Sequence, residues 1–155
     1  MYRRTWLRLG VGGLCLAGLG VGLRATGLQL TVFDATDAEL LSTSVEDGSE
    51  VIVEYTHSVE KTLIRDQYVV SGNRLVMSRM EFSSFGAGLP AQADVRVENG
   101  RYVYEPPPQE YETLRLTTGA IADHDLIVDG QRYDIASMAA GETIELRITE
   151  RRHLL

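Results

Sequence analysis

Apolar and polar residues alternate in short runs along most of the chain, with turn residues between the runs. In the last run Ile144, Leu146 and Ile148 alternate with three polar residues, which provides one face for burial and one for solvent. The runs are too short and too regularly interrupted to indicate a long amphipathic helix. The pattern predicts strands at residues 28–33, 39–45, 50–57, 63–70, 74–83, 94–97, 101–104, 113–117, 125–128, 131–135 and 143–149.

Turn residues between the predicted strands indicate antiparallel neighbours. Asn99-Gly100 and Asp129-Gly130 each separate two runs, and Asn or Asp followed by Gly is preferred in two-residue hairpins. Residues 105–110, Glu-Pro-Pro-Pro-Gln-Glu, predict a surface crossover, because proline cannot donate a ladder hydrogen bond. We therefore expect one all-β domain at residues 28–155, either an antiparallel β-sandwich or a partly open β-barrel.

Residues 1–27 have the composition of a signal peptide or membrane anchor. Arg3 and Arg4, followed by Trp6, Leu7 and Arg8, resemble a twin-arginine export signal, which is an address read by a receptor. The uncharged run at 9–23 would extend about 22 Å as a helix, against a hydrocarbon core of roughly 30 Å. Small residues at Ala25-Thr26-Gly27 are compatible with cleavage by a signal peptidase. Cleaved or retained, this leader predicts an extracytoplasmic domain at the outer face of the cytoplasmic membrane.

The single cysteine of the chain lies inside this leader. Cys15 follows Leu14, where a lipidation site requires a small residue, so we expect no lipid at this position. The predicted domain has no other cysteine and therefore no disulfide. Its stability must come from its core and its strand ladders.

Charge is distributed unevenly between the leader and the predicted domain. All 22 acidic residues follow Arg24, whereas four of the 15 basic residues belong to the leader, so the charge beyond Arg24 is 15 − 4 − 22 = −11. Such a surface repels nucleic acids and anionic lipids, and neither is an expected partner. Arginine with excess acid and a single lysine, Lys61, is also typical of halophilic proteins, although a GC-rich genome favours arginine too.

The stretch from Tyr55 to Thr62 is rich in functional groups and follows a predicted strand. Strand period places His57 on the inward face with Val53 and Tyr55. This histidine can be a general base oriented by Glu60 or Glu81, a metal ligand, or a structural group bonded to nearby backbone. The structural interpretation is the simplest, because no partner lies at a fixed spacing.

A second unusual stretch runs from Glu81 to Pro90 and contains Gly86 and Gly88. It lacks the lysine and helix of a phosphate-binding loop, and neither of its serines lies in a nucleophile elbow. A tight turn packed over by Phe82 or Phe85 is the simplest interpretation.

Asp123, His124 and Asp125 form a third candidate, for a divalent cation. Three consecutive side chains seldom face one ion, and no further His or Cys lies at ligand spacing. A polar turn before the next strand is the simpler interpretation, and we expect no metal and no cofactor.

Two motifs in fixed order, together with Tyr68, resemble domain-of-unknown-function family 1850. The motifs are the segments His57-Ser58-Val59-Glu60-Lys61-Thr62 and Phe82-Ser83-Ser84-Phe85-Gly86-Ala87-Gly88-Leu89-Pro90. Leu63, Ile64 and Asp66 depart mildly from the family pattern. The resemblance implies a small exported or membrane-anchored domain, often encoded beside or fused to TAXI-type TRAP transporters. These transporters use an extracytoplasmic solute receptor.

The resemblance makes an accessory role in solute uptake the leading hypothesis. We expect contact with the transporter receptor or membrane subunit, or with a solute, through a surface that includes His57, Ser58, Glu60, Lys61, Phe82, Ser84, Phe85, Gly86, Gly88 and Pro90. One alternative is an extracytoplasmic enzyme that uses His57 as acid or base. A further alternative is a structural surface module without a binding site.

Overall fold

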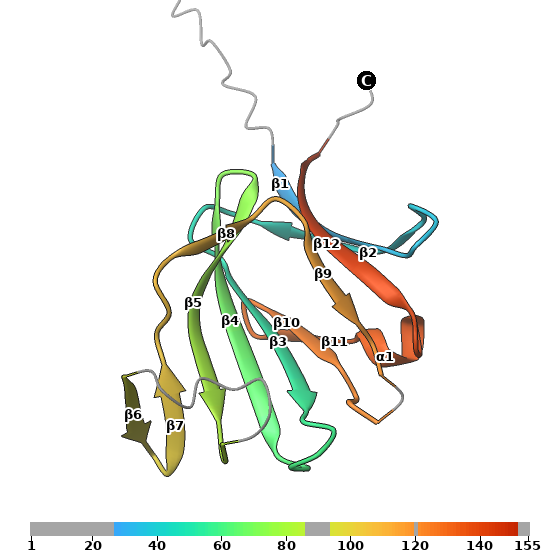
Figure 1. Cartoon of the computed structure of the whole chain (residues 1–155). Coiled ribbons are helices and arrows are strands. Elements are labelled where there is room, and N and C mark those ends of the chain that lie inside the picture. Colours follow the sequence, from blue (N-terminus) through green and yellow to red (C-terminus); the bar gives the residue numbers. More distant parts are fainter. Residues whose placement is uncertain (1–26, 86–93, 120, 152–155) are drawn as a thin grey trace, which may run out of the picture.

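The computed structural model describes residues 27–85, 94–119 and 121–151. Within them the chain forms two β-sheets and one helical turn (Figure 1). The elements are β1 (Leu28–Phe33), β2 (Glu39–Val45), β3 (Glu50–Thr56), β4 (Leu63–Ser71), β5 (Arg74–Phe82), β6 (Val95–Glu98), β7 (Arg101–Tyr104), β8 (Gln109–Tyr111), β9 (Leu114–Thr117), β10 (Asp125–Val128), β11 (Gln131–Asp134), α1 (Ile135–Met138) and β12 (Thr143–Glu150).

The two sheets differ in size. The smaller sheet has the strand order β2-β1-β12-β9, and the larger has the order β11-β10-β3-β4-β5-β7-β6, with β8 also paired to β5. Every pairing is antiparallel, and the sheets do not close into a barrel. The prediction of an all-β antiparallel sandwich is confirmed.

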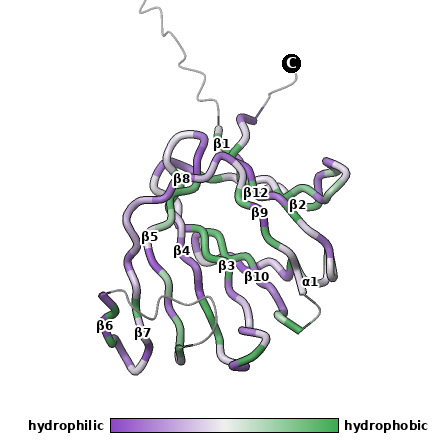
Figure 2. The backbone as a smooth tube through the Cα atoms, in the orientation of Figure 1, coloured by the Kyte–Doolittle hydropathy of each residue, from purple (hydrophilic) through white to green (hydrophobic). Residues whose placement is uncertain are grey.

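The core lies between the two sheets. Leu30 of β1 and Leu146 of β12 face Val53 and Val70 of the larger sheet, and all four side chains are buried in one cluster. Hydrophobic and hydrophilic residues alternate along the strands (Figure 2), as expected for sheets with one buried face. The smaller sheet covers the part of the larger sheet nearest to the start of β1, and its strands do not extend over the other part (Figure 1).

The predicted hairpins are present with the expected backbone. Asn99 and Gly100 have φ of 51° and 78°, and Asp129 and Gly130 have φ of 46° and 85°. Left-handed φ at both positions is what a type I′ turn requires. Asn99-Gly100 and Asp129-Gly130 therefore specify the hairpins β6–β7 and β10–β11.

The predicted strand boundaries agree with the structure to within one residue, but two elements were missed. Gln109–Tyr111 forms β8, which pairs with Leu75–Met77 of β5. The prolines do make a crossover. The residues after them have N–H groups that can donate ladder hydrogen bonds, so the chain returns and pairs with the edge of β5. The other missed element is α1. Asp134 is its N-cap, because Asp134 Oδ1 accepts the Ser137 N–H at 2.8 Å, and β11 therefore ends before Ile135.

The predicted leader at 1–26 lies outside the described residues. In the described ranges, no helix has both the length and the apolar character needed to cross a membrane.

Leu146→Ala tests the position of the core. Leu146 is fully buried between the sheets, so truncation should lower the free energy of unfolding by about 3–5 kcal/mol. Ile121→Ala, at an exposed position, should change it by less than about 0.5 kcal/mol. Urea unfolding of both variants provides the measurement, and equal losses would contradict this packing.

Candidate functional site

The two sequence motifs meet at one end of the larger sheet. The first motif is the turn between β3 and β4, and the second begins at the end of β5. Thr62 Oγ1 and Ser84 Oγ lie 3.3 Å apart and share a hydrogen bond. We call this part of the molecule the distal end, because β1 starts at the opposite end of the sandwich (Figure 1).

His57 organises the turn between β3 and β4. Its Nδ1 accepts hydrogen bonds from the backbone N–H of Val59 at 3.3 Å and of Glu60 at 3.1 Å. The backbone N–H of His57 donates to Thr62 O at 2.8 Å, and the backbone carbonyl of His57 accepts the Lys61 N–H at 2.9 Å. With both donors in place, the Nδ1 lone pair is engaged and is not available to take a proton from a substrate. These hydrogen bonds to nearby backbone are what the structural interpretation of His57 expects.

The two carboxylates considered as partners of His57 are placed differently. Glu60 is an exposed residue of the turn, next to exposed Ser58 and Lys61. Glu81 contacts Arg79 at 2.9 Å and Gln67 at 3.3 Å. Strand alternation places these residues on the outer face of the sheet, opposite to Phe82. Catalysis by His57 therefore stays a prediction. The contacts of Glu81 with Arg79 and Gln67 on the outer face do not support it.

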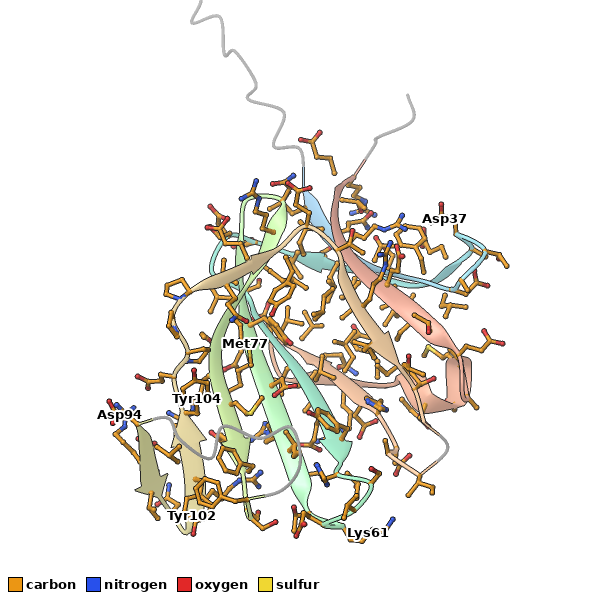
Figure 3. All side chains as sticks on the ribbon, viewed as in Figure 1. Asp37, Lys61, Met77, Asp94, Tyr102 and Tyr104 are labelled. Carbon is orange, nitrogen blue, oxygen red and sulfur yellow. The ribbon has the colours of Figure 1, made fainter. Side chains whose placement is uncertain are left out.

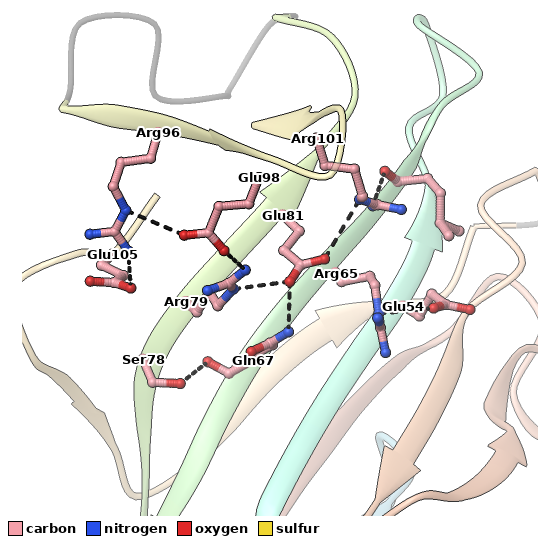
Figure 4. A network of polar contacts seen from close by, with 11 residues as sticks. Glu54, Arg65, Gln67, Ser78, Arg79, Glu81, Arg96, Glu98, Arg101 and Glu105 are labelled. Atoms are coloured by element: carbon pink, nitrogen blue, oxygen red, sulfur yellow. Dashed lines mark hydrogen bonds and ion pairs between the residues drawn. The ribbon is translucent and has the colours of Figure 1, made fainter. Parts of the chain in front are cut away.

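Glu81 belongs to a network of ion pairs that crosses the outer face of the larger sheet (Figure 4). Glu98 contacts Arg79 at 2.8 Å and Arg96 at 3.4 Å, and Glu54 contacts Arg65 at 3.1 Å. Pairs at this level of exposure each contribute at most about 1 kcal/mol. The outer face is accordingly a solvated charged surface whose acidic groups are already paired.

Aromatic side chains fill the distal end beside the second motif. Phe82 is fully buried, and the rings of Phe85 and Tyr102 lie 5.3 and 5.6 Å from it between centroids. Phe85 and Tyr102 are 4.4 Å apart, yet Phe85 keeps 44% of its surface exposed. Gly86, Gly88 and Pro90 lie outside the described residues.

Exposed apolar side chains also gather at the distal end. Across the described ranges six large hydrophobic residues are exposed, and five are at or next to this end: Val59, Leu63, Phe85, Val97 and Ile121. Val97 is paired with Tyr102, and the residue after Ile121 accepts the Thr56 N–H at 2.7 Å. The sixth is Met138 of α1. The sequence could reveal such residues only after the strand pairings were known.

A carboxylate that the sequence reasoning passed over lies on the inner face. Asp66 Oδ2 accepts a hydrogen bond from the Tyr55 hydroxyl at 3.3 Å, while Asp66 Oδ1 is buried and has no hydrogen-bond partner among the described residues. Burial raises the pKa of Asp66 to about 6, against the lowering effect of the Tyr55 bond. Burial, followed by the charge of Asp66, raises the pKa values of Tyr55 and Tyr68. Strand period alone could have found this acid, because Ile64, Asp66 and Tyr68 share a face.

Asp123, His124 and Asp125 do not converge. His124 is 7% exposed and stacks on the Tyr55 ring at 5.1 Å, and burial lowers its pKa against the opposing effect of Asp123. Asp125 pairs with Arg132 on the outer face, whereas Asp123 is exposed. Among the residues that the structure describes, no three His, Cys, Asp or Glu side chains are grouped to hold a metal ion.

A hollow of about 360 Å³ lies away from both motifs, beside the start of β1. Its lining includes Ser44, Glu46 and Arg151. Glu46 and Arg151 are exposed surface residues, so the hollow brings no buried charged group to a ligand.

His57→Ala tests the structural role of this side chain. Loss of the two bonds to Nδ1 should lower the free energy of unfolding by about 1–2 kcal/mol. His57→Asn should lose less, because an Asn side chain can accept a backbone N–H two residues on. Thermal and urea unfolding provide the comparison, and equal stability of His57→Ala and wild type would contradict the role.

Asp66→Asn tests the burial of this carboxyl group. Its pKa of about 6 in the folded chain exceeds the ordinary 3.8, so its contribution is most favourable below pH 4 and is lost as the pH rises to 6. The variant should therefore gain stability relative to wild type across this window, by up to about 3 kcal/mol at pH 7. Urea unfolding at pH 4 and pH 7 gives the difference. A variant less stable than wild type at pH 7 would show that the charge is compensated.

Comparison with known proteins identifies one family. Residues 51–135 match the model of the family described as Domain of unknown function (DUF1850), and the match runs from the second residue of β3 past the end of β11 and includes both motifs. No curated protein and no solved structure matches the chain significantly. The matched residues cover more than half of the chain, and the resemblance of the motifs to this family is confirmed. The chain therefore belongs to the DUF1850 family.

Proposed function

We propose that this chain is an extracytoplasmic accessory domain that assists a TAXI-type TRAP solute transporter by binding one of its protein components through the distal end. Two features of the sequence support this role. The leader resembles an export signal, and the family resemblance implies a position beside such transporters. The docked component is the solute receptor or the membrane subunit.

The meeting of the two motifs is the observation that carries the proposal. Thr62 and Ser84 join segments that are 22 residues apart, and apolar side chains remain exposed beside the junction. The side chain of Val59 is 70% exposed and that of Phe85 is 44% exposed, so neither is buried in the core. Exposed apolar groups that gather on one surface are typical of protein interaction sites.

The surroundings of these apolar residues also resemble an interface. Ser58, Glu60 and Lys61 are exposed on the same turn as Val59. An apolar centre with a polar rim is the usual arrangement of a transient protein interface. The ring of Phe85 packs against the rings of Phe82 and Tyr102, which hold it in place. Aromatic residues held in this way are frequent binding hot spots.

The position of the distal end favours the receptor over the membrane subunit. The strand β1 starts at the opposite end of the sandwich (Figure 1), where the leader joins the domain. If the leader is retained as an anchor, the distal end is directed away from the membrane. An exported solute receptor reaches that surface more easily than a subunit embedded in the bilayer does.

Val59→Asp in the full-length chain tests the docking surface. Removing an exposed apolar contact and adding a charge should weaken binding to the purified receptor at least tenfold, about 1.4 kcal/mol, without lowering the melting temperature. Phe85→Ser should weaken binding further. Met138→Ser, at the exposed apolar position of α1, is the matched control and should bind as wild type does.

Binding measured by calorimetry should be accompanied by a loss of solute uptake in cells that carry Val59→Asp. Unchanged binding of both distal variants would contradict the proposed surface. Normal uptake after deletion of the gene, with the transporter active, would contradict the accessory role itself.

A further inference from the structure

The strand orders of the two sheets end on four strands, each paired on one side only in the described part of the chain. The smaller sheet ends on β2 and β9, and the larger sheet ends on β11 and β6. The unpaired side of such an edge strand presents backbone N–H and C=O groups that can pair with a strand of another chain. Proteins normally prevent this with short edge strands, charged residues or proline.

Three of these edge strands are protected in this way. β6, β9 and β11 have four residues each. Each also carries an arginine that forms an ion pair with a neighbouring carboxylate, namely Arg96, Arg115 and Arg132. A strand that approached one of them would meet a short edge and a charged side chain. These three edges therefore do not favour pairing with another chain.

The edge strand β2 lacks this protection. It has seven residues without a proline, and of these only Glu39, at its start, is charged. Leu40 is skipped in the pairing with β1, and the register is regular from Leu41 to Val45. No strand pairs with the other side of β2 in the described ranges, and Ser44 is exposed. Five consecutive uncharged residues thus form a regular free edge.

Side-chain contacts on both faces of the sheet hold this edge in place. Thr43 pairs with buried Leu30 and so lies on the inner face, where its Oγ1 is 3.0 Å from the Tyr133 hydroxyl. On the outer face, Ser42 Oγ lies 3.3 Å from Thr31 Oγ1. An edge that is already ordered loses little conformational entropy when it pairs, which favours association.

The residues of this edge are arranged nearly symmetrically about Thr43. If two copies pair antiparallel with Thr43 opposite itself, Ser42 lies opposite Ser44 and Leu41 lies opposite Val45. Each pair then joins side chains of the same kind on the same face of the sheet. A two-fold axis is the commonest symmetry of homodimers. A second copy of this chain therefore matches the edge along its whole regular part.

We propose that two copies of this chain associate through β2, antiparallel about Thr43, and so join their four-stranded sheets into one continuous sheet. Five residues from each copy are fewer than the roughly 20 of a standard interface, so the dimer is weak and reversible. The edge is separate from the distal end. Asp37, in the turn before β2, lies far from Lys61 and Tyr102 (Figure 3), so each proposal can fail without the other.

Acidic residues next to the paired edge give the dimer a characteristic salt dependence. Beyond the five pairs, Glu39 of one copy approaches Glu46 and Asp47 of the other, and each chain carries a charge of −11 beyond Arg24. Like charges oppose association. Salt shortens the screening length from about 10 Å at 0.1 M to about 3 Å at 1 M. Association should therefore strengthen as the salt concentration rises.

Sedimentation equilibrium of the full-length chain in detergent tests the interface. Wild type should show a reversible monomer–dimer equilibrium, with a Kd at least about threefold lower in 1 M than in 0.1 M NaCl. Ser44→Glu places a charge beside Ser42 of the other copy and should weaken the dimer at least about tenfold, with an unchanged melting temperature. Thr117→Glu, at an exposed position of β9 in the same sheet, is the matched control and should associate as wild type does.

Cross-linking tests the register independently of these variants. With Cys15 replaced by serine, a mixture of Ser42→Cys and Ser44→Cys should form a disulfide on oxidation, because these positions lie opposite each other. Either variant alone should form at least about tenfold less, because its two copies of the cysteine lie on a diagonal about 7–8 Å apart.

Three results would overturn the proposal. The first is a chain that stays monomeric at about 1 mM at both salt concentrations. The second is a Ser44→Glu variant that associates as tightly as wild type. The third is an equal yield of disulfide from the mixture and from either cysteine variant alone.

Discussion

Side chains of a β-sheet alternate between two faces, and the smaller sheet of this domain covers one face of the larger sheet only in part. Where the two sheets overlap, Leu30, Leu146 and Val53 form a closed apolar core. Beyond the overlap, the same alternation continues where no strand of the smaller sheet lies over the larger one. Tyr102, Tyr104 and most of the exposed apolar side chains are found there (Figure 3). The unequal size of the sheets thus separates a half with a closed core from a half in which apolar side chains remain exposed.

Among the described residues, charged side chains are paired on the outer face of the larger sheet but not on its inner face. On the outer face, arginines and glutamates from neighbouring strands pair with one another, as Arg79 does with Glu81 and Glu98. On the inner face Asp66 has no such partner in the described part of the chain, and burial raises its pKa. A change of one residue in strand register would exchange these faces and bury the arginines. The register of β4 and β5 is therefore fixed by charge as well as by packing.

Much of this fold could be predicted from the alternation and the turn dipeptides, because both are local. Asp129-Gly130 is sufficient to specify the hairpin of β10 and β11, and period two placed Tyr55 on the inner face. Three features could not be predicted because they depend on strand order. These are the contact of Thr62 with Ser84, the return of β8 to β5 after the prolines, and the exposure of Phe85 beside Tyr102. The role of His57 depended on the path of a turn, which no periodicity reveals.

The central claim is that the distal end is a docking surface for a transporter component. Photo-cross-linking in membranes that contain the active transporter tests it most directly, with p-benzoylphenylalanine introduced at position 85 or, as the control, at position 138. The account predicts a covalent product between position 85 and the solute receptor or membrane subunit, identified by mass spectrometry, and no such product from position 138. No product with any transporter component from position 85, or equal products from both positions, would contradict it.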